Sequence, residues 1–372
     1  MYIIERFLHN RNIVRHPTDG IKALAQNYLL RQLAMGMVTS FGVLFIFQLA
    51  SDFFVGLFLV AAFIVAQRIA VAASIPFSAS FISRVGYRRT IFVSLVALVV
   101  KMYLFSITQP DYLLPLIPAA IFGGFVISSY FLSYHAIFLD DNTEAKIGEQ
   151  AGRIESLGRV AIIVSPFLAG YIVDVFSFHI LFLTVVALLI LSMMPLVTMK
   201  HHKRHFGSYS LGKAWDFIRK RPKVSWSMYF WVITYAIQSV YWPIYLYLVV
   251  KDYRLFGLIG SVVMMASSVA VYYTGKLYDK SSHRRLFWGS TVMVSASWLA
   301  RFVSTTSISA GISDTVNRLF SPPWWMKVRR KELLAGEETD SLVFGAAHEY
   351  LSTAAVISGA VIGYLVLVVG KG

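Results

Sequence analysis

The sequence predicts an all-α polytopic membrane protein built as two pseudo-symmetric helical bundles, with about 11 transmembrane helices. Of its 372 residues, 57% are hydrophobic and 14% are charged, whereas a soluble domain carries about 25% charged residues. The apolar residues fall in blocks of about 18–25, the length that a helix needs to cross about 30 Å of hydrocarbon. A basic segment occurs twice, at residues 83–89 and 275–285, each time between two apolar blocks. Such a repeat is typical of transporters, whose substrate site lies between two similar halves.

The apolar blocks define the expected elements in order. Residues 1–32 are expected to form an N-terminal cytoplasmic arm in which Asp19 caps the start of an amphipathic helix. Spans are then predicted at residues 33–50, 54–79, 90–107, 112–138, 154–175, 178–198, 224–249, 255–275, 286–306, 309–327 and 342–368. Six spans form an N-terminal bundle (33–198), residues 199–223 form a basic linker, and five spans form a C-terminal bundle (224–372).

The basic residues predict the orientation of the chain. Most of the 34 Lys and Arg residues lie in the arm and in alternate loops, whereas the other loops and the tail contain Lys251, Arg254 and Lys371. Because Lys and Arg accumulate in cytoplasmic loops, we expect a cytoplasmic N-terminus and a location in the plasma (inner) membrane. The formal net charge of +15 has the same explanation, so we expect no binding of nucleic acid.

The linker is the longest connection between predicted spans. Its middle, residues 210–219, is expected to form a short helix on the inner leaflet, with Trp215 and Phe217 at the interface. Its His-rich run, residues 201–205, is compatible with metal binding, but we favour simple cytoplasmic charge and expect no metal site.

The two basic segments share a pattern of glycine and arginine. The second contains Gly275, Asp279, Lys280, Arg284 and Arg285, and the first contains Arg84, Gly86, Arg88 and Arg89. This pattern resembles the G-x-x-x-D-R-x-G-R-R signature of the major facilitator superfamily, which lies between spans two and three and recurs between spans eight and nine. The first copy departs from it, with Ser83 in place of the acid and Ala79 in place of the leading glycine.

The resemblance implies two bundles of six helices with a cavity lined by spans one, four, seven and ten. Since eleven spans are predicted, we expect the last helix of the C-terminal bundle to be missing. The fifth span, with Gly158, Pro166 and Gly170, is similar to the Gly- and Pro-rich fifth span of antiporters in this family. The same residues also allow simple close packing of helices.

Ionisable side chains within spans are the first candidates for the site, because they are costly in lipid. Arg68 lies near the middle of the second span, where we expect either an anion-binding cation facing the cavity or a structural ion pair. Asp314 and Arg318 lie four residues apart on one face of the tenth span, with Asn317 beside them. We expect either a titratable acid whose protonation competes with binding or a self-neutralising pair.

Three further expectations concern residues near the ends of spans. Pro322 and Pro323 are expected to break or kink the tenth span. Lys101 and Arg301 lie nearer the outer surface, where we expect their side chains to extend toward the headgroups.

Other candidates lie on the cavity-lining spans that the resemblance implies. They are Gln48, Tyr134, His135, Gln238, Tyr241 and Trp242, for which packing is the alternative. A cytoplasmic gate is expected from the motif residues together with Glu155, Arg159 and Glu349. Simple placement at the membrane interface is the alternative for these last three.

These observations favour a secondary active transporter that moves a small solute by alternating access, driven by protons. The excess of cations within spans favours an anionic or zwitterionic substrate. We expect no cofactor and no enzyme: the chain has no Cys, no P-loop pattern and none of the common hydrolase motifs. The alternatives are a lipid or lysolipid flippase on the same scaffold and a transport-inactive relative.

Overall fold

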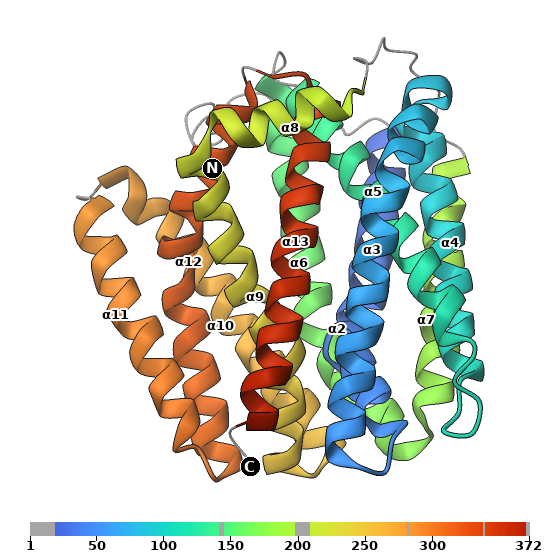
Figure 1. The fold of residues 1–372 in the computed structure, drawn as a ribbon, viewed down its shortest axis with the longest axis vertical. Helices are drawn as coiled ribbons and strands as arrows, with labels where there is room; N and C mark the ends of the chain where they lie inside the picture. Colours follow the sequence, from blue (N-terminus) through green and yellow to red (C-terminus); the bar gives the residue numbers. More distant parts are fainter. Residues whose placement is uncertain (1–18, 141–144, 198–208, 281–282, 338, 370–372) are drawn as a thin grey trace.

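The computed structural model describes residues 19–140, 145–197, 209–280, 283–337 and 339–369. This part of the chain contains twelve helices and no β-strand. Their bounds are α2 (Asp19–Gln48), α3 (Phe53–Val85), α4 (Tyr87–Ile107), α5 (Leu116–Asp140), α6 (Ala145–Val175), α7 (Phe178–Val197), α8 (Leu211–Lys220), α9 (Pro222–Val250), α10 (Tyr253–Lys280), α11 (His283–Phe302), α12 (Ser307–Glu337) and α13 (Ser341–Val369). The long helices run side by side, and α8 lies across their ends at the top of Figure 1.

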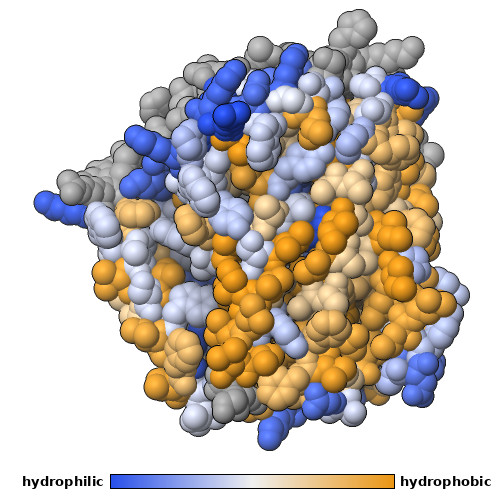
Figure 2. All heavy atoms as spheres, viewed as in Figure 1, coloured by the Kyte–Doolittle hydropathy of each residue, from blue (hydrophilic) through white to orange (hydrophobic). Residues whose placement is uncertain are grey.

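The surface and the helix lengths agree with a membrane-spanning bundle. Nine helices among the described residues are long and apolar enough to cross a membrane. Apolar side chains cover the middle of the face in Figure 2, and hydrophilic ones gather toward its top and bottom edges. The helices α11 and α12 are more polar, because they carry Arg301, Asp314 and Arg318 within their lengths, but they run alongside the other helices in Figure 1.

Two helices differ from the predicted spans in a way that bears on the site. The first span begins earlier than expected, because α2 is one continuous helix from Asp19. A break or a kink was predicted at Pro322 and Pro323, and there is no break, since α12 continues to Glu337. Pro322 cannot donate to the carbonyl of Arg318, and the hydroxyl of Ser321 lies 3.5 Å from that oxygen instead. The helix therefore continues with a substitute for one lost backbone bond.

The contacts between helices repeat in the two halves of the chain. In the first half α2 packs on α6, α3 on α5 and α4 on α5; in the second half α9 packs on α13, α10 on α12 and α11 on α12. The halves meet where α6 packs on α10, α3 on α13 and α2 on α9. The predicted pseudo-symmetric bundles are confirmed by this pattern.

The helices α6 and α10 approach each other backbone to backbone. A Cβ added at Gly257 would lie 2.4 Å from the carbonyl oxygen of Pro166, and one added at Gly170 would lie 2.3 Å from the carbonyl oxygen of Tyr253. The Ser261 hydroxyl also accepts a hydrogen bond of 3.1 Å from the backbone N–H of Phe167. The small residues of the fifth span thus form a contact between the halves, as small residues do where membrane helices pack closely.

The halves also touch at both ends of the bundle. At the end away from α8, Arg254 pairs with Asp174 at 2.6 Å, and Tyr253 donates a 3.0 Å hydrogen bond to Gln48. At the α8 end, a buried apolar cluster joins α3, α5, α8 and α13, and includes Ile75, Ala79, Ile82, Leu132, Phe217, Leu342 and Ala346. The two halves of the chain are therefore in contact at both ends of the bundle.

The short helix α8 was predicted at residues 210–219 and is confirmed. Its N-cap is Ser210, whose side chain accepts from the backbone N–H of Lys213. Trp215 is exposed, as expected, but Phe217 does not face the interface, because it is buried against Phe344 at 5.8 Å between ring centres. Just before the helix, burial raises the pKa of the Tyr209 phenol, so this hydroxyl stays protonated.

Candidate functional site

A buried ion pair lies between α11 and α12. Arg301 is 4% exposed and Asp314 is 5% exposed. A guanidinium nitrogen of Arg301 donates to an Asp314 carboxylate oxygen at 2.6 Å. The Nε atom of Arg318 lies 4.0 Å from the same oxygen. The expected neighbour pair Asp314–Arg318 is therefore part of a three-member group that the sequence did not reveal.

Two tryptophans hold the Arg301 guanidinium. It lies 4.1 Å from the ring centre of Trp242 on α9 and 4.4 Å from that of Trp298 on α11. Indole faces attract cations, most strongly where both groups are desolvated. The expectation that Arg301 extends to the outer headgroups was wrong, because its side chain turns inward to the Asp314 carboxylate.

A chain of amides continues the polar group toward α9. The side chain of Gln238 donates to the amide oxygen of Asn317 at 2.9 Å, and Asn317 donates to the hydroxyl of Ser297 at 2.8 Å. Asn317 is 1% exposed. Buried amides that are hydrogen-bonded on both sides hold fixed positions. Gln238, Asn317 and Asp314 were all predicted candidates, and the structure brings them together.

Several donors in this group have no hydrogen-bond partner among the described residues. They are Nε of Trp242, Nε and one terminal nitrogen of Arg301, and Nε of Arg318, all buried. An unpaired buried donor costs about 1–3 kcal/mol, so native structures satisfy nearly all of them. We refer to Gln238, Trp242, Arg301, Asp314, Asn317 and Arg318 as the α9–α12 cluster. These unpaired N–H groups can donate additional hydrogen bonds to a group that offers acceptor oxygens.

Arg68 lies apart from this cluster, on α3. It is half-buried, and the groups that act electrostatically on it are Glu349 of α13 and Tyr235 of α9. It also acts on Lys101 of α4, whose ammonium lies 5.7 Å from the ring centre of Phe63. Arg68 and Glu349 thus come from opposite halves of the chain.

Glu349 belongs to a second charged group near the α8 end. His348 pairs with Glu332 of α12 and lies 4.0 Å from the carboxylate of Glu349. Both acids are 3% exposed. Glu349 is therefore buried between helices, and the sequence alternative of simple interfacial placement does not hold for it.

Other predicted candidates are placed elsewhere or fall outside the described side chains. Gln48 bonds Tyr253 at the contact between halves, and the Tyr241 hydroxyl donates to the carbonyl of Ala360. Both therefore serve helix packing in this conformation. The side chains of Tyr134 and His135 lie outside the described set, as does the whole His-rich run at 201–205. In the part of the chain that the structure describes, no group of three His, Asp or Glu side chains can hold a metal.

The first basic motif forms a one-residue junction between helices. The helix α3 ends at Val85 and α4 begins at Tyr87, with Gly86 between them at a φ of 83°. This left-handed backbone conformation favours glycine, so it explains why a glycine occupies this position of the motif. Arg84 and Arg89 are exposed.

The second motif is mostly helical rather than a loop. The helix α10 continues through Gly275 to Lys280, and α11 begins at His283. Arg285 is exposed and Arg159 is half-buried. The remaining motif side chains, those of Arg88, Asp279, Arg284 and Glu155, lie outside the described set. Their expected role in a gate stays a prediction.

Two repeated bundles of apolar helices with buried charges define a multi-pass membrane transport protein. The sequence profile of the Major Facilitator Superfamily matches residues 24–321, so the chain belongs to this family. The predicted family and fold class are confirmed.

One solved structure with the same fold is the crystal structure of a D-xylose-proton symporter. It aligns with a TM-score of 0.68 over 92% of this chain and 89% of that chain, at 12% sequence identity. At this identity the likeness shows the fold alone. No curated protein matches the sequence.

Proposed function

We propose that this protein is a proton-coupled secondary transporter for a small anionic solute, and that Asp314 is the proton site. The observation that carries the proposal is the α9–α12 cluster, in which one buried carboxylate faces two guanidinium groups that keep unpaired donors. Ionisable groups at membrane depth are retained for function more often than for packing. The symporter with the same fold agrees with proton coupling.

The charges of the cluster predict how protonation of Asp314 changes the affinity for an anion. Two arginines and one aspartate give the cluster a net charge of about +1, and a proton on Asp314 raises it to about +2. The carboxylate of Asp314 and a substrate anion offer the same kind of acceptor to the same donors, so they compete. Protonation of Asp314 therefore favours anion binding. This linkage has the opposite sign to the competition between protonation and binding that we expected for Asp314 from the sequence.

The contacts between the halves support alternating access. The Arg254–Asp174 pair closes one end, and the apolar cluster of α3, α8 and α13 closes the other. Breaking one set at a time would open the bundle to one side, with the close contact of α6 and α10 as the pivot. From the distribution of basic residues we place the α8 end in the cytoplasm and the protein in the inner membrane.

A ligand-stability screen tests the substrate class. Purified protein is unfolded thermally with small carboxylates, phosphate esters, amino acids, sugars and lysophospholipids. A ligand at 100 times its Kd stabilises the folded state by about 2.7 kcal/mol. We expect a carboxylate or phosphate ester to raise the Tm, and to raise it more at low pH. Stabilisation by sugars alone would contradict an anionic substrate, and stabilisation by lysophospholipids alone would favour a lipid flippase.

Three variants locate the binding site of the ligand found in this screen. Arg318→Gln removes one of the unpaired donors and should lower the affinity for the ligand at least tenfold, which is about 1.4 kcal/mol of binding free energy. Arg68→Gln tests whether the anion also contacts the charge between the halves, and we expect a loss of the same size. Arg219→Gln on α8 removes an equal charge from an exposed position and should leave affinity unchanged. Equal losses in all three variants would contradict a local site.

A further inference from the structure

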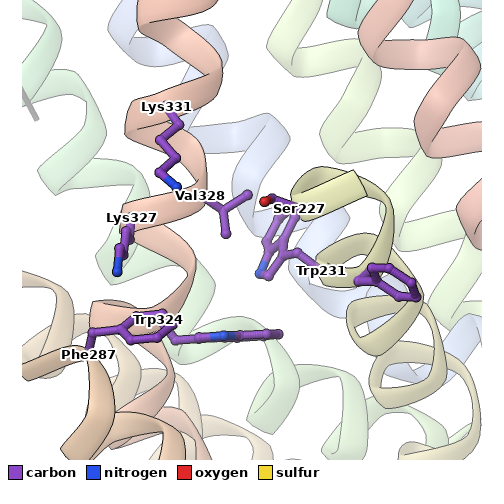
Figure 3. Close-up of a pocket in the computed structure, with 8 residues that line it drawn as sticks. Ser227, Trp231, Phe287, Trp324, Lys327, Val328 and Lys331 are labelled. Carbon is purple, nitrogen blue, oxygen red and sulfur yellow. The ribbon is translucent and has the colours of Figure 1, made fainter. Parts of the chain in front are cut away.

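A pocket of about 270 Å³ lies between α9, α11 and α12, outside the α9–α12 cluster. Its walls include Trp231 of α9, Phe287 of α11 and Trp324 of α12, together with two lysines of α12, Lys327 and Lys331 (Figure 3). The ammonium group of Lys327 is 3.9 Å from the ring centre of Phe287. The pocket therefore combines an aromatic floor with two positive charges.

The two lysines lie at the depth of lipid headgroups. The helix α12 begins at Ser307, and about twenty residues at about 1.5 Å each carry it about 30 Å, the thickness of the hydrocarbon core. That distance ends near Lys327, and Lys331 is one turn further. Trp324 and Trp231 then lie at the level where interfacial tryptophans are enriched.

The helices beside the pocket carry exposed apolar side chains. They include Trp226 and Phe230 on α9, and Trp288, Val292 and Leu299 on α11. Apolar helix surfaces beside a pocket with two lysines match an amphiphile with an anionic head and hydrocarbon tails.

The charges of the pocket are available for such a head. Neither Lys327 nor Lys331 forms an ion pair with a described residue. The nearest acid in sequence, Glu332, is buried and pairs with His348 of α13. A phosphate group would therefore find two cations without a competing carboxylate.

We propose that this pocket binds one anionic phospholipid, with its headgroup phosphate on Lys327 and Lys331 and an acyl chain on the exposed apolar side chains of α9 and α11. The site is separate from substrate binding and from proton coupling.

The test measures phospholipid retained by the delipidated protein, using native mass spectrometry and titration with phosphatidylglycerol or phosphatidylcholine. We expect one tightly held phosphatidylglycerol and no such phosphatidylcholine. Each lysine near an anionic headgroup contributes to its binding. The variant K327Q/K331Q should therefore bind phosphatidylglycerol about thirtyfold more weakly. The charge-keeping variant K327R/K331R should retain it.

The matched control is K213Q/R219Q, which removes two exposed charges from α8 and should change the affinity little. Thermal unfolding without added lipid checks that each variant is folded. Three results would each overturn the proposal. They are an equal loss of lipid in K327Q/K331Q and K213Q/R219Q, an affinity for phosphatidylcholine equal to that for phosphatidylglycerol, and a dimer of the protein that retains no lipid.

Discussion

Replacing Asp314 by Asn is expected to lower the free energy of unfolding by about 3–5 kcal/mol, because it leaves the Arg301 guanidinium buried without its acid. Removing both partners should cost less than the two single changes together. Arg301→Met keeps apolar contact with Trp242 and Trp298, so the double variant R301M/D314N loses the charge and keeps much of the packing. Denaturant unfolding in mixed micelles measures all three variants, and we expect a coupling free energy of about 1–3 kcal/mol.

The chain contains a matched control for this result. The pair Asp174–Arg254 has the same 2.6 Å separation, but both side chains are partly exposed. Exposed pairs contribute about 0–1 kcal/mol, so Asp174→Asn should change stability by no more than that. Additive effects of Arg301→Met and Asp314→Asn would show that the buried pair is not formed in the folded protein.

Replacing Gly257 by Ala is expected to destabilise the protein and to stop transport. The new Cβ would lie 2.4 Å from the Pro166 carbonyl oxygen and 3.1 Å from the Gly170 Cα atom. Both are backbone atoms, so α6 and α10 must separate, and overpacking of this kind costs about 1–3 kcal/mol. If this contact is the pivot of alternating access, separated helices no longer rock together. Unfolding in micelles and uptake of the identified ligand into proteoliposomes measure the two effects.

The control for this substitution is Gly289→Ala in α11. A Cβ at Gly289 meets no atom within 4 Å, and alanine favours a helix over glycine by up to about 1 kcal/mol. Gly289→Ala should therefore be neutral or slightly stabilising, with normal uptake. Unchanged stability and uptake in Gly257→Ala would contradict the close approach of α6 and α10.

The sequence predicted the helices well because the signal for a span is local. The blocks of apolar residues and the basic segments between them predicted the eleven long helices and α8. The predicted break at Pro322–Pro323 failed because a local substitute, the Ser321 hydroxyl, lies at the freed carbonyl. The inward position of Phe217 was missed for a different reason: only tertiary packing on Phe344 decides which face of α8 is buried.

The site was predicted only in part. The spacing of Asp314, Asn317 and Arg318 placed them together, because helix periodicity is visible in sequence. Nothing in the sequence joined Arg301 to Asp314, since the contact crosses from α11 to α12 and the position of Arg301 near a helix end favoured an outward side chain. The cations within the predicted spans could have suggested the Arg301–Asp314 pair, because a buried charge is normally paired with an opposite charge.

The most direct test of proton coupling is the movement of protons with the solute identified in the screen. Proteoliposomes that contain a pH-sensitive dye are given an inward gradient of the solute, with wild-type protein, Asp314→Asn and the double variant R301M/D314N. We predict that the wild type acidifies the lumen as the solute enters and that neither variant does. Asp314→Asn keeps both arginines and should still bind the solute, whereas R301M/D314N also loses donors of the cluster. Acidification that persists unchanged in the two variants, or solute entry into wild-type vesicles with no change of pH, would contradict the assignment of Asp314 as the proton site.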